Sequence, residues 1–411
     1  MRFDTRAIHA AQDADPATGA LILPICQTST FVQEAPGVHR GFDYSRTNNP
    51  TRQTLERVLA DLEGGRHAAV FASGLAAENA VLQALLRPGD HVLTTADLYG
   101  GTFRLLDAVW RPLGLEWTGL DLDDEAAFER AVRPGTRLVW VESPTNPRLR
   151  IHDLASIAAR ARRRGLITVV DNTFASPVNQ RPLELGADLV VHSVTKYLSG
   201  HSDVIQGAVI ARDERWFQPV KFLQNATGAV PSPFDCWLTL RGLKTLGLRV
   251  GRHNANAQRV AEFLAGREEV ARVHYPGLPT HPRHVVARRQ MSGFGGVVSL
   301  ELDASLEETR RFVSTRRFFK LGESLGGVKS LICHPATMTH ASIPAAERAR
   351  LGLPDGLVRL SVGIEDAADL IEDLEEGLEA CSGAQANASF GNPDPSTGPA
   401  GVSSQSSSTV A

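Results

Sequence analysis

The chain has 411 residues, of which 42% are hydrophobic and 22% charged, and its formal net charge is −3. This composition is ordinary for a globular protein, and the length allows two or three domains. The near balance of 43 basic and 46 acidic residues indicates neither nucleic acid nor an anionic membrane as a partner.

Cysteine usage and the N-terminus bear on the compartment. Four scattered cysteines with no CxxC pair argue against a disulfide framework or a zinc site: Cys26, Cys236, Cys333 and Cys381. The first residues, "MRFDTRAIHAAQDAD", contain no apolar core of a signal peptide, and no stretch reaches the ~18 apolar residues of a membrane span. We therefore expect a cytoplasmic protein without a membrane partner.

The first part of the chain has little periodicity. Residues 1–48 contain several prolines and glycines, and we expect them to form an extended arm. A helix is predicted over the next stretch, "NNPTRQTLERVLADLEGG". There Pro50 suits the first turn, Leu55, Val58 and Leu59 have helical spacing, and a glycine pair follows.

Residues 49–235 alternate between helix and strand signals. The stretches "HAAVFAS" and "DHVLTT" are predicted strands, and helices are predicted over "GLAAENAVLQALL" and 153–165. Four further apolar runs are bounded by turns and show no polar alternation: 137–142, 166–171, 188–193 and 204–211. Such runs are typical of strands buried on both faces of a mainly parallel sheet. The fold class is therefore α/β.

The remaining sequence has a different character. Residues 234–266 are predicted to form one long helix, with weak points at its glycines. Together with the strand and helix signals that follow, residues 236–381 indicate a smaller α+β domain. The tail, 382–411, is rich in Ser, Gly, Pro and Ala and is expected to be disordered, because it has almost no large apolar residue to bury.

Chemically useful side chains follow the predicted strands. In open α/β sheets, ligands bind beyond the carboxyl ends of the strands. The strand ends offer a helix N-terminus, an aromatic ring, an amide, a carboxylate and an amine, contributed by Ser73, Gly74, Tyr99, Asn146, Asp171, Ser193, Thr195 and Lys196.

One cofactor uses all of these groups. A desolvated lysine can form a Schiff base with the aldehyde of pyridoxal 5'-phosphate, which then acts as an electron sink. A carboxylate such as Asp171 suits the ring nitrogen, and Tyr99 suits stacking on the ring. The helix N-terminus at Gly74, with the Ser193 hydroxyl, suits the phosphate.

The individual residues also have plainer interpretations. Asp171 could be a turn or a helix cap, Lys196 a solvated loop cation and Asn146 a turn residue, in a noncatalytic α/β binding protein. An absorbance band near ~420 nm that disappears in Lys196→Ala would distinguish the enzyme. No G-x-G-x-x-G fingerprint follows a strand, and no third ligand accompanies His192 and His201, so neither a dinucleotide nor a metal is expected.

The segment "DNTFASPVNQRPLELGADLVVHSVTKYLSGHSD", residues 171–203, closely resembles the signature of the cysteine and methionine metabolism family of pyridoxal-phosphate enzymes. The resemblance extends from "AIHAAQDADPATGALILPICQTSTF" to "RLSVGIED" and leaves out only the tail. This family includes the cystathionine γ-lyases, γ-synthases and β-lyases, the methionine γ-lyases and the homoserine sulfhydrylases.

The resemblance implies a fold-type I, aminotransferase-like architecture in a homotetramer whose paired subunits share their active sites. It implies Lys196 as the cofactor lysine, Asp171 as the partner of the ring nitrogen and Tyr99 as the stacking and acid–base residue. The other implied contacts are Gly74, Leu75, Ser193 and Thr195 for the phosphate, Tyr44 and Arg46 for the phosphate of the neighbouring subunit, and Arg359, Asn146 and Ser324 around the substrate carboxylate.

The reaction is harder to assign within this family. Asp43 and Glu323 match acidic residues that meet the distal ammonium group of cystathionine, which favours a cystathionine γ-lyase. A cystathionine γ-synthase, which joins a homoserine ester to cysteine, is the nearest alternative. Gly101 stands where methionine γ-lyases usually carry a cysteine, so that activity is disfavoured, as is a homoserine sulfhydrylase. Lys329 departs from the usual glutamate of the family.

Overall fold

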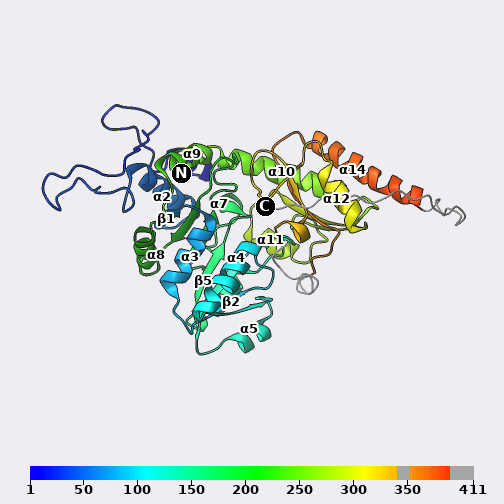
Figure 1. Cartoon of the computed structure of the whole chain (residues 1–411), viewed down its shortest axis with the longest axis horizontal. Coiled ribbons are helices and arrows are strands. Elements are labelled where there is room, and N and C mark those ends of the chain that lie inside the picture. The colour runs from blue at the N-terminus through cyan, green and yellow to red at the C-terminus, as the bar shows by residue number, and fades with distance from the viewer. Residues whose placement is uncertain (340–351, 389–411) are drawn as a thin grey trace, which may run out of the picture.

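The computed structural model describes residues 1–339 and 352–388. It has two sheets with helices packed around them (Figure 1). The larger sheet belongs to the first part of the chain and has seven strands in the order β1-β7-β6-β5-β4-β2-β3. The smaller sheet belongs to the second part and has five strands in the order β10-β11-β12-β9-β8. The α/β fold class predicted from the sequence is confirmed.

The large sheet is mainly parallel. Its strands are β1 (His67–Phe71), β2 (His91–Thr95), β3 (Glu116–Leu120), β4 (Thr136–Glu142), β5 (Ile167–Asp171), β6 (Leu189–Ser193) and β7 (Gly207–Ala211). Pairing is parallel from β3 through β2, β4 and β5 to β6, whereas β7 lies antiparallel to both β6 and β1. Because β7 is antiparallel to both neighbours, β1 has the same direction as β6. The strand within the apolar run 204–211 is shorter than predicted, since it begins only at Gly207.

Helices cover both faces of this sheet. They are α2 (Pro50–Glu63), α3 (Gly74–Leu85), α4 (Gly100–Arg104), α5 (Glu125–Ala131), α6 (Leu154–Arg163), α7 (Ser176–Asn179) and α8 (Glu214–Thr227). The side chains of α3 and α8 share one apolar cluster with the sheet, and those of α5 and α6 share another on the opposite face. A π-helical turn, Leu105–Trp110, continues α4.

The start of α2 shows how the local sequence sets an element. The side chain of Asn49 caps the helix by accepting hydrogen bonds from the backbone N–H groups of Thr51 and Arg52, and Pro50 occupies the first turn. Gly64 ends the helix with φ 73°, a left-handed conformation that glycine adopts without steric cost. The predicted boundaries of this helix are thus confirmed.

The predicted long helix over 234–266 is wrong. Two helices lie there, α9 (Pro233–Leu243) and α10 (Leu246–Ala265), and Lys244 and Thr245 separate them. The break coincides with close packing on both sides. A Cβ at Gly242 would lie 2.3 Å from the backbone oxygen of Ser199, and one at Gly247 would lie 1.8 Å from a carboxylate oxygen of Asp4. Glycine at these two positions therefore lets both helices approach distant segments closely.

The smaller part of the molecule contains the remaining elements. They are β8 (Val270–His274), α11 (His284–Gln290), β9 (Val297–Leu302), α12 (Leu306–Ser314), β10 (Lys320–Leu321), β11 (Leu331–Cys333), β12 (Leu357–Ser361) and α14 (Ala367–Ala388). One apolar cluster unites α10, α12 and α14 with β9 and β12. Helix α14 includes the first seven residues of the segment that we expected to form a tail, and residues 389–411 lie outside the described residues.

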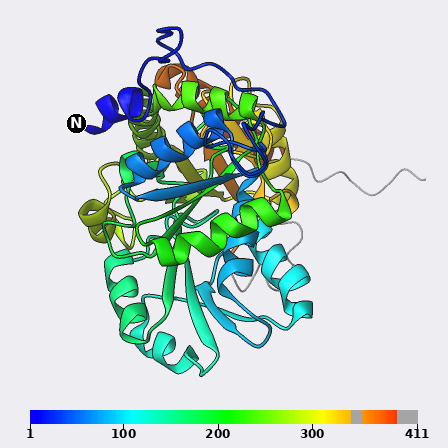
Figure 2. The same cartoon turned by 90° about the vertical axis from the view of Figure 1, so that its left-hand side faces the viewer.

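The N-terminal arm projects from the left-hand side of the molecule in Figure 1, and Figure 2 views the molecule from that side. It begins with a short helix, α1 (Phe3–His9), which the sequence analysis did not predict and whose Ala7 is buried. Beyond it the arm exposes apolar side chains, with Leu21 81% and Val32 95% exposed. Over residues 1–339 and 352–388, no helix is long and apolar enough to cross a membrane.

Candidate active site

A cavity of about 750 Å³ lies at the carboxyl ends of the strands of the large sheet. It collects most of the side chains that the sequence analysis placed at strand ends. The predicted residues that line it are Gly74, Leu75, Tyr99, Asn146, Asp171, Ser193, Thr195, Lys196, Glu323, Ser324 and Arg359. The last three come from the smaller part of the molecule, so the cavity lies between the two sheets.

Lys196 occupies the centre of this arrangement. It follows β6, and its Nζ donates a hydrogen bond to Oγ of Ser324 at 2.8 Å. Burial, and then the neighbouring Arg359 guanidinium, lower the pKa of Lys196 to about 8, although Glu323 opposes this shift. A lysine whose pKa is lowered in this way is neutral far more often near neutral pH than an ordinary lysine, and its neutral amine can act as a nucleophile or a base.

Asp171 ends β5 and lines the same cavity. One of its carboxylate oxygens accepts a hydrogen bond from the backbone N–H of Thr173 at 2.9 Å. Burial raises the pKa of Asp171, while the two hydrogen bonds from Thr173, and less strongly His192, act in the opposite direction. A carboxylate in such a place binds a protonated ring nitrogen well, because both charges are removed from water.

The start of α3 lies close to β6. Ser73 caps the helix, its Oγ accepting a hydrogen bond from the backbone N–H of Ala76 at 3.1 Å. A Cβ on Gly74 would lie 3.0 Å from the Cβ of Ser193, so glycine lets the helix N-terminus approach that serine. The hydroxyl of Thr195 is bonded to both backbone groups of Gln206. Free N–H groups at a helix N-terminus beside a serine suit a phosphate.

Arg359 is positioned by two residues of the cavity. Its guanidinium donates to Oδ1 of Asn146 and to the backbone oxygen of Ser324, both at 2.9 Å. Ser324 has a φ of 104°, a strained conformation for a residue other than glycine. In this conformation its oxygen faces Arg359 while its hydroxyl receives the bond from Lys196. Ser324 thus links the amine to the guanidinium.

Tyr99 is held from two sides. Its backbone N–H donates to the carboxylate of Glu142 at 2.8 and 3.1 Å. Its ring lies against Gly101, where a Cβ would be 2.4 Å from a ring carbon, so a larger residue at position 101 would displace the ring. Burial first, and then Glu78, raise the pKa of Tyr99, which keeps its phenol protonated near neutral pH.

Two further carboxyl groups line the cavity, and the sequence analysis gave neither a role. Glu78 lies on α3 and Glu142 ends β4, and both are about 95% buried. Burial, and then the charge of Asp171, raise the pKa of Glu78 to about 8 and that of Glu142 well above its usual range. Position 78 has the sequence signal of an ordinary helix residue, so only the fold reveals this carboxyl cluster.

Three predicted residues do not line the Lys196 cavity of their own chain: Asp43, Tyr44 and Arg46. Tyr44 and Arg46 border a separate cavity of about 370 Å³ beside Gly228, and the Arg46 guanidinium lies 5.2 Å from the centre of the Tyr44 ring. The carboxylate of Asp43 accepts a hydrogen bond from the N–H of Tyr44 at 2.7 Å.

Lys329 is exposed, and nothing in the structure explains its departure from glutamate.

Comparisons with known proteins decide the family. Residues 4–379 match the family described as Cys/Met metabolism PLP-dependent enzymes. The chain belongs to this family. It is therefore an enzyme that uses pyridoxal phosphate, and the resemblance stated from the sequence is confirmed.

Relatives with different activities match about equally well. The chain is 53% identical over 378 residues to a cystathionine beta-lyase of Coxiella burnetii, with 92% of this chain and 97% of the relative covered. It is 54% identical over 375 residues to a cystathionine gamma-synthase of Mycobacterium tuberculosis, with 91% and 96% covered. It is 48% identical over 381 residues to a cystathionine gamma-lyase of Dictyostelium discoideum, with 92% and 98% covered.

Solved structures agree with the fold. A cystathionine gamma synthase from Xanthomonas oryzae pv. oryzae in complex with aminoacrylate and cysteine has a TM-score of 0.91 at 46% identity, with 93% of this chain and 99% of that chain covered. A cystathionine gamma-lyase from Lactobacillus plantarum complexed with L-serine has a TM-score of 0.90 at 43% identity, with 93% and 100% covered. The pyridoxal-phosphate architecture is thus confirmed, and the reaction remains to be assigned within the family.

Proposed function

We propose that the chain is a cystathionine γ-lyase, which converts cystathionine and water to cysteine, 2-oxobutanoate and ammonia. The observation that carries the proposal is the bonded series in which Lys196 contacts Ser324, and Ser324 contacts Arg359. Glu323, adjacent to this series, lines the same cavity. A cationic receptor for one end of an amino acid, a base and an anionic group are therefore brought together.

The residues around Lys196 are suited to hold the cofactor. The N-terminus of α3 at Gly74 and Leu75, with Ser193, would hold its phosphate, and Asp171 would pair with its ring nitrogen. Lys196 would bond its aldehyde carbon. When bound, pyridoxal phosphate supplies the electron sink that makes the α-proton of an amino acid acidic.

The side chains of the cavity have distinct roles in the proposed reaction. Arg359 binds the substrate carboxylate through paired N–H donors, and Asn146 fixes the orientation of the guanidinium. The Lys196 amine removes the α-proton and then a β-proton. Tyr99, whose phenol is protonated, donates its proton to the departing sulfur. Glu323 pairs with the distal ammonium group of cystathionine, which selects this substrate over methionine.

A substrate comparison tests the assignment. We expect cystathionine alone to yield 2-oxobutanoate, which a ketoacid assay measures. The second candidate is a cystathionine γ-synthase, supported by the 54% identity to the mycobacterial synthase. If turnover occurs only when succinyl- or acetyl-homoserine is supplied with cysteine, the lyase assignment is wrong and the synthase takes its place. Cysteine with pyruvate as the products from cystathionine would instead identify a β-lyase.

We further propose a homotetramer built from dimers that share their active sites. Asp43, Tyr44 and Arg46 lie on the exposed arm and outside the Lys196 cavity of their own chain, which supports a role for them in a neighbouring subunit. The unpaired thiols of Cys26, Cys236 and Cys333 support a reducing compartment such as the cytoplasm.

A further inference from the structure

Two chain segments meet beside the candidate active site, and each follows a strand of the large sheet. The segment 96–99 follows β2 and ends at Tyr99, and the segment 143–152 follows β4 and contains Asn146. Because β2 and β4 are parallel neighbours, their carboxyl ends bring the two segments together. Tyr99 and Asn146 both line the cavity around Lys196, so contacts between the segments affect the geometry of that cavity.

Two carboxyl groups join these segments in opposite directions. Glu142, which immediately precedes segment 143–152, accepts a hydrogen bond from the backbone N–H of Tyr99 at 2.8 Å. Asp97, in the other segment, accepts one from the hydroxyl of Thr145 at 2.7 Å. All three groups that form the side-chain ends of these bonds are buried. The two bonds therefore fix segment 143–152 against the segment that carries Tyr99.

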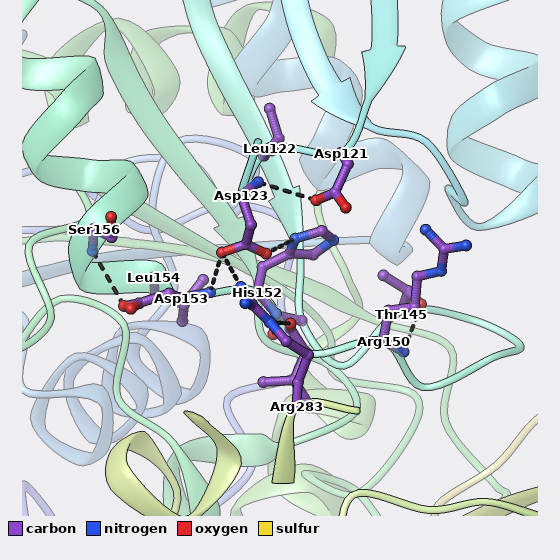
Figure 3. Close-up of polar contacts among 12 residues, drawn as sticks. Asp121, Leu122, Asp123, Thr145, Arg150, His152, Asp153, Leu154, Ser156 and Arg283 are labelled. Carbon is purple, nitrogen blue, oxygen red and sulfur yellow. Dashed lines mark hydrogen bonds and ion pairs between the residues drawn. The ribbon is translucent and has the colours of Figure 1, made fainter. Parts of the chain in front are cut away.

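Thr145 also closes a short loop within segment 143–152. Its hydroxyl oxygen accepts a hydrogen bond from the N–H of Arg150 at 3.0 Å, and its own N–H donates to the backbone oxygen of Arg150, also at 3.0 Å. Figure 3 shows Thr145 beside Arg150. The hydroxyl thus accepts from Arg150 and donates to Asp97, which uses both of its hydrogen-bonding capacities. The position of Asp97 is thereby imposed on the loop that contains Asn146.

Asn146, the next residue, orients the proposed receptor of the substrate carboxylate. It is 3% exposed, and its Oδ1 accepts a hydrogen bond from the Arg359 guanidinium at 2.9 Å. The second bond of the guanidinium goes to the backbone oxygen of Ser324, in the smaller part of the molecule. A shift of the loop therefore moves one of the two acceptors that hold Arg359.

The ends of segment 143–152 are held independently of Asp97. The N–H of His152 donates to Oγ of Ser143 at 3.0 Å, which joins the two ends. Nδ1 of His152 also lies 2.7 Å from Oδ2 of Asp123, as Figure 3 shows. Loss of the bond to Asp97 should therefore shift the loop between the ends without unfolding the segment.

Asp97 makes the fold less stable than an apolar residue would. It is 4% exposed, and its Oδ1 makes no hydrogen bond within residues 1–339 and 352–388. Burial raises the pKa of Asp97, and the bond from Thr145 and then the charge of Arg150 offset this effect only in part. Burying a carboxyl group with so few partners costs free energy. The group is therefore better explained by the position that it imposes on Thr145 than by stability.

We propose that Asp97 and Thr145 are positioning residues for substrate binding, which orient Arg359 through Asn146. This inference rests on the proposed role of Arg359 as the receptor of the substrate carboxylate. Neither Asp97 nor Thr145 lines the cavity around Lys196, so both act through their neighbours. Loss of their bond should weaken the binding of a substrate carboxylate and leave the binding of a plain amine unchanged.

Two matched ligands of the holoenzyme test this proposal. 2-Methylalanine carries the carboxylate of an amino acid but no α-proton for Lys196 to remove, and isopropylamine is the same molecule without the carboxylate. The absorbance of the bound cofactor reports the dissociation constants of both. We expect Thr145→Val, which keeps the shape of the side chain, to weaken 2-methylalanine binding about tenfold and isopropylamine binding less than about twofold. Thr145→Ser keeps the hydroxyl and should bind both ligands as the wild type does.

A double-mutant cycle shows whether Asp97 acts through Thr145. Asp97→Ala should weaken 2-methylalanine binding as much as Thr145→Val does. Combining the two changes should weaken it no further, because both remove the same bond. Additive losses would show that the two residues act separately and would overturn the proposal, as would an equal loss of affinity for both ligands.

Arg359→Gln separates this inference from the proposed function. If this variant binds 2-methylalanine as tightly as the wild type, the role proposed for Arg359 is wrong, and the positioning role falls with it. If Arg359→Gln weakens the binding but Thr145→Val and Asp97→Ala do not, the carboxylate receptor stands and only the positioning role of Asp97 and Thr145 is wrong.

Discussion

At the scale of single residues, the proposed chemistry depends on charges placed around Lys196. Beyond the effect of burial, Arg359 lowers the pKa of this amine and Glu323 raises it. Two residues proposed to bind opposite ends of the substrate thus also act on the proton of the proposed base. Ser324, in its strained conformation, is bonded to both Lys196 and Arg359. In the proposed reaction, substrate binding and proton transfer are therefore coupled through direct contacts.

The rate of cofactor capture should report this coupling. We expect the rate at which the apoenzyme takes up pyridoxal phosphate to rise with pH with a midpoint near pH 8, because the neutral amine is the nucleophile. Arg359→Gln should move the midpoint to higher pH and Glu323→Gln to lower pH. Stopped-flow absorbance measures the rate. Equal midpoints in the two variants would contradict this assignment of charges.

Glu78 should make the folded apoenzyme less stable as pH rises. Its pKa is about 8 in the folded protein against an ordinary value of 4.5, so between these two values the folded state binds more protons than the unfolded state. Stability then falls by up to about 1.4 kcal/mol per pH unit across that window. Below pH 4.5 both states are protonated and this penalty is absent.

Glu78→Gln removes this titration and keeps the shape of the side chain. We therefore expect the unfolding free energy of the variant, measured in urea, to increase relative to that of the wild type as pH rises from 5 to 8. The exposed residue Glu268 provides the control, because Glu268→Gln should leave the pH dependence unchanged. Parallel curves for Glu78→Gln and the wild type would show that Glu78 is ionised in the folded apoenzyme.

At the scale of secondary-structure elements, the junction of α9 and α10 depends on close contact. A Cβ at Gly242 would lie 2.3 Å from a backbone oxygen, whereas one at Gly251, in the middle of α10, would meet no atom within 4 Å. Gly242→Ala should therefore destabilise the protein by about 1–3 kcal/mol. Gly251→Ala should stabilise it by up to about 1 kcal/mol, because alanine favours the helix. Thermal unfolding of the two variants should give shifts of opposite sign.

The same elements show what a sequence pattern can predict. The strands 137–142, 166–171 and 188–193 were predictable because they are buried on both faces and therefore read as continuous apolar runs. β3 was missed because it is an edge strand that is only partly buried. The junction of α9 and α10 packs closely against Ser199 and Asp4, which are far away in the sequence, and helical periodicity alone carries no information on such contacts.

The candidate site shows a similar division. Gly74, Asp171, Ser193 and Lys196 follow predicted strands and could be expected at one edge of the sheet. Arg359 and Ser324 approach that edge from the smaller part of the molecule, and the resemblance to a known family was needed to propose them. Neither the strand pattern nor the resemblance to the family identified Glu78, because its burial near Asp171 depends on how α3 packs on the sheet.

At the scale of the whole molecule, the arm should complete the active site of a neighbouring chain. Lys196→Ala and Arg46→Ala should each be nearly inactive alone. When the two are dissociated and reassembled together, each mixed dimer regains one intact site, so activity should recover to about a quarter of the wild-type value. Native mass spectrometry verifies that mixed oligomers form. Mixed oligomers without activity would show that Arg46 serves its own chain.

The segment 143–152 has a consequence for how this enzyme can diversify. Asn146 lines the cavity around Lys196, whereas Arg150 and His152, on the same segment, line a separate cavity of about 940 Å³. Thr145, next to Asn146, accepts a hydrogen bond from the N–H of Arg150, so substitutions at Asn146 and at Arg150 should not combine additively. Changes outside the Lys196 cavity, at Arg150 or His152, are therefore expected to alter substrate preference through Asn146.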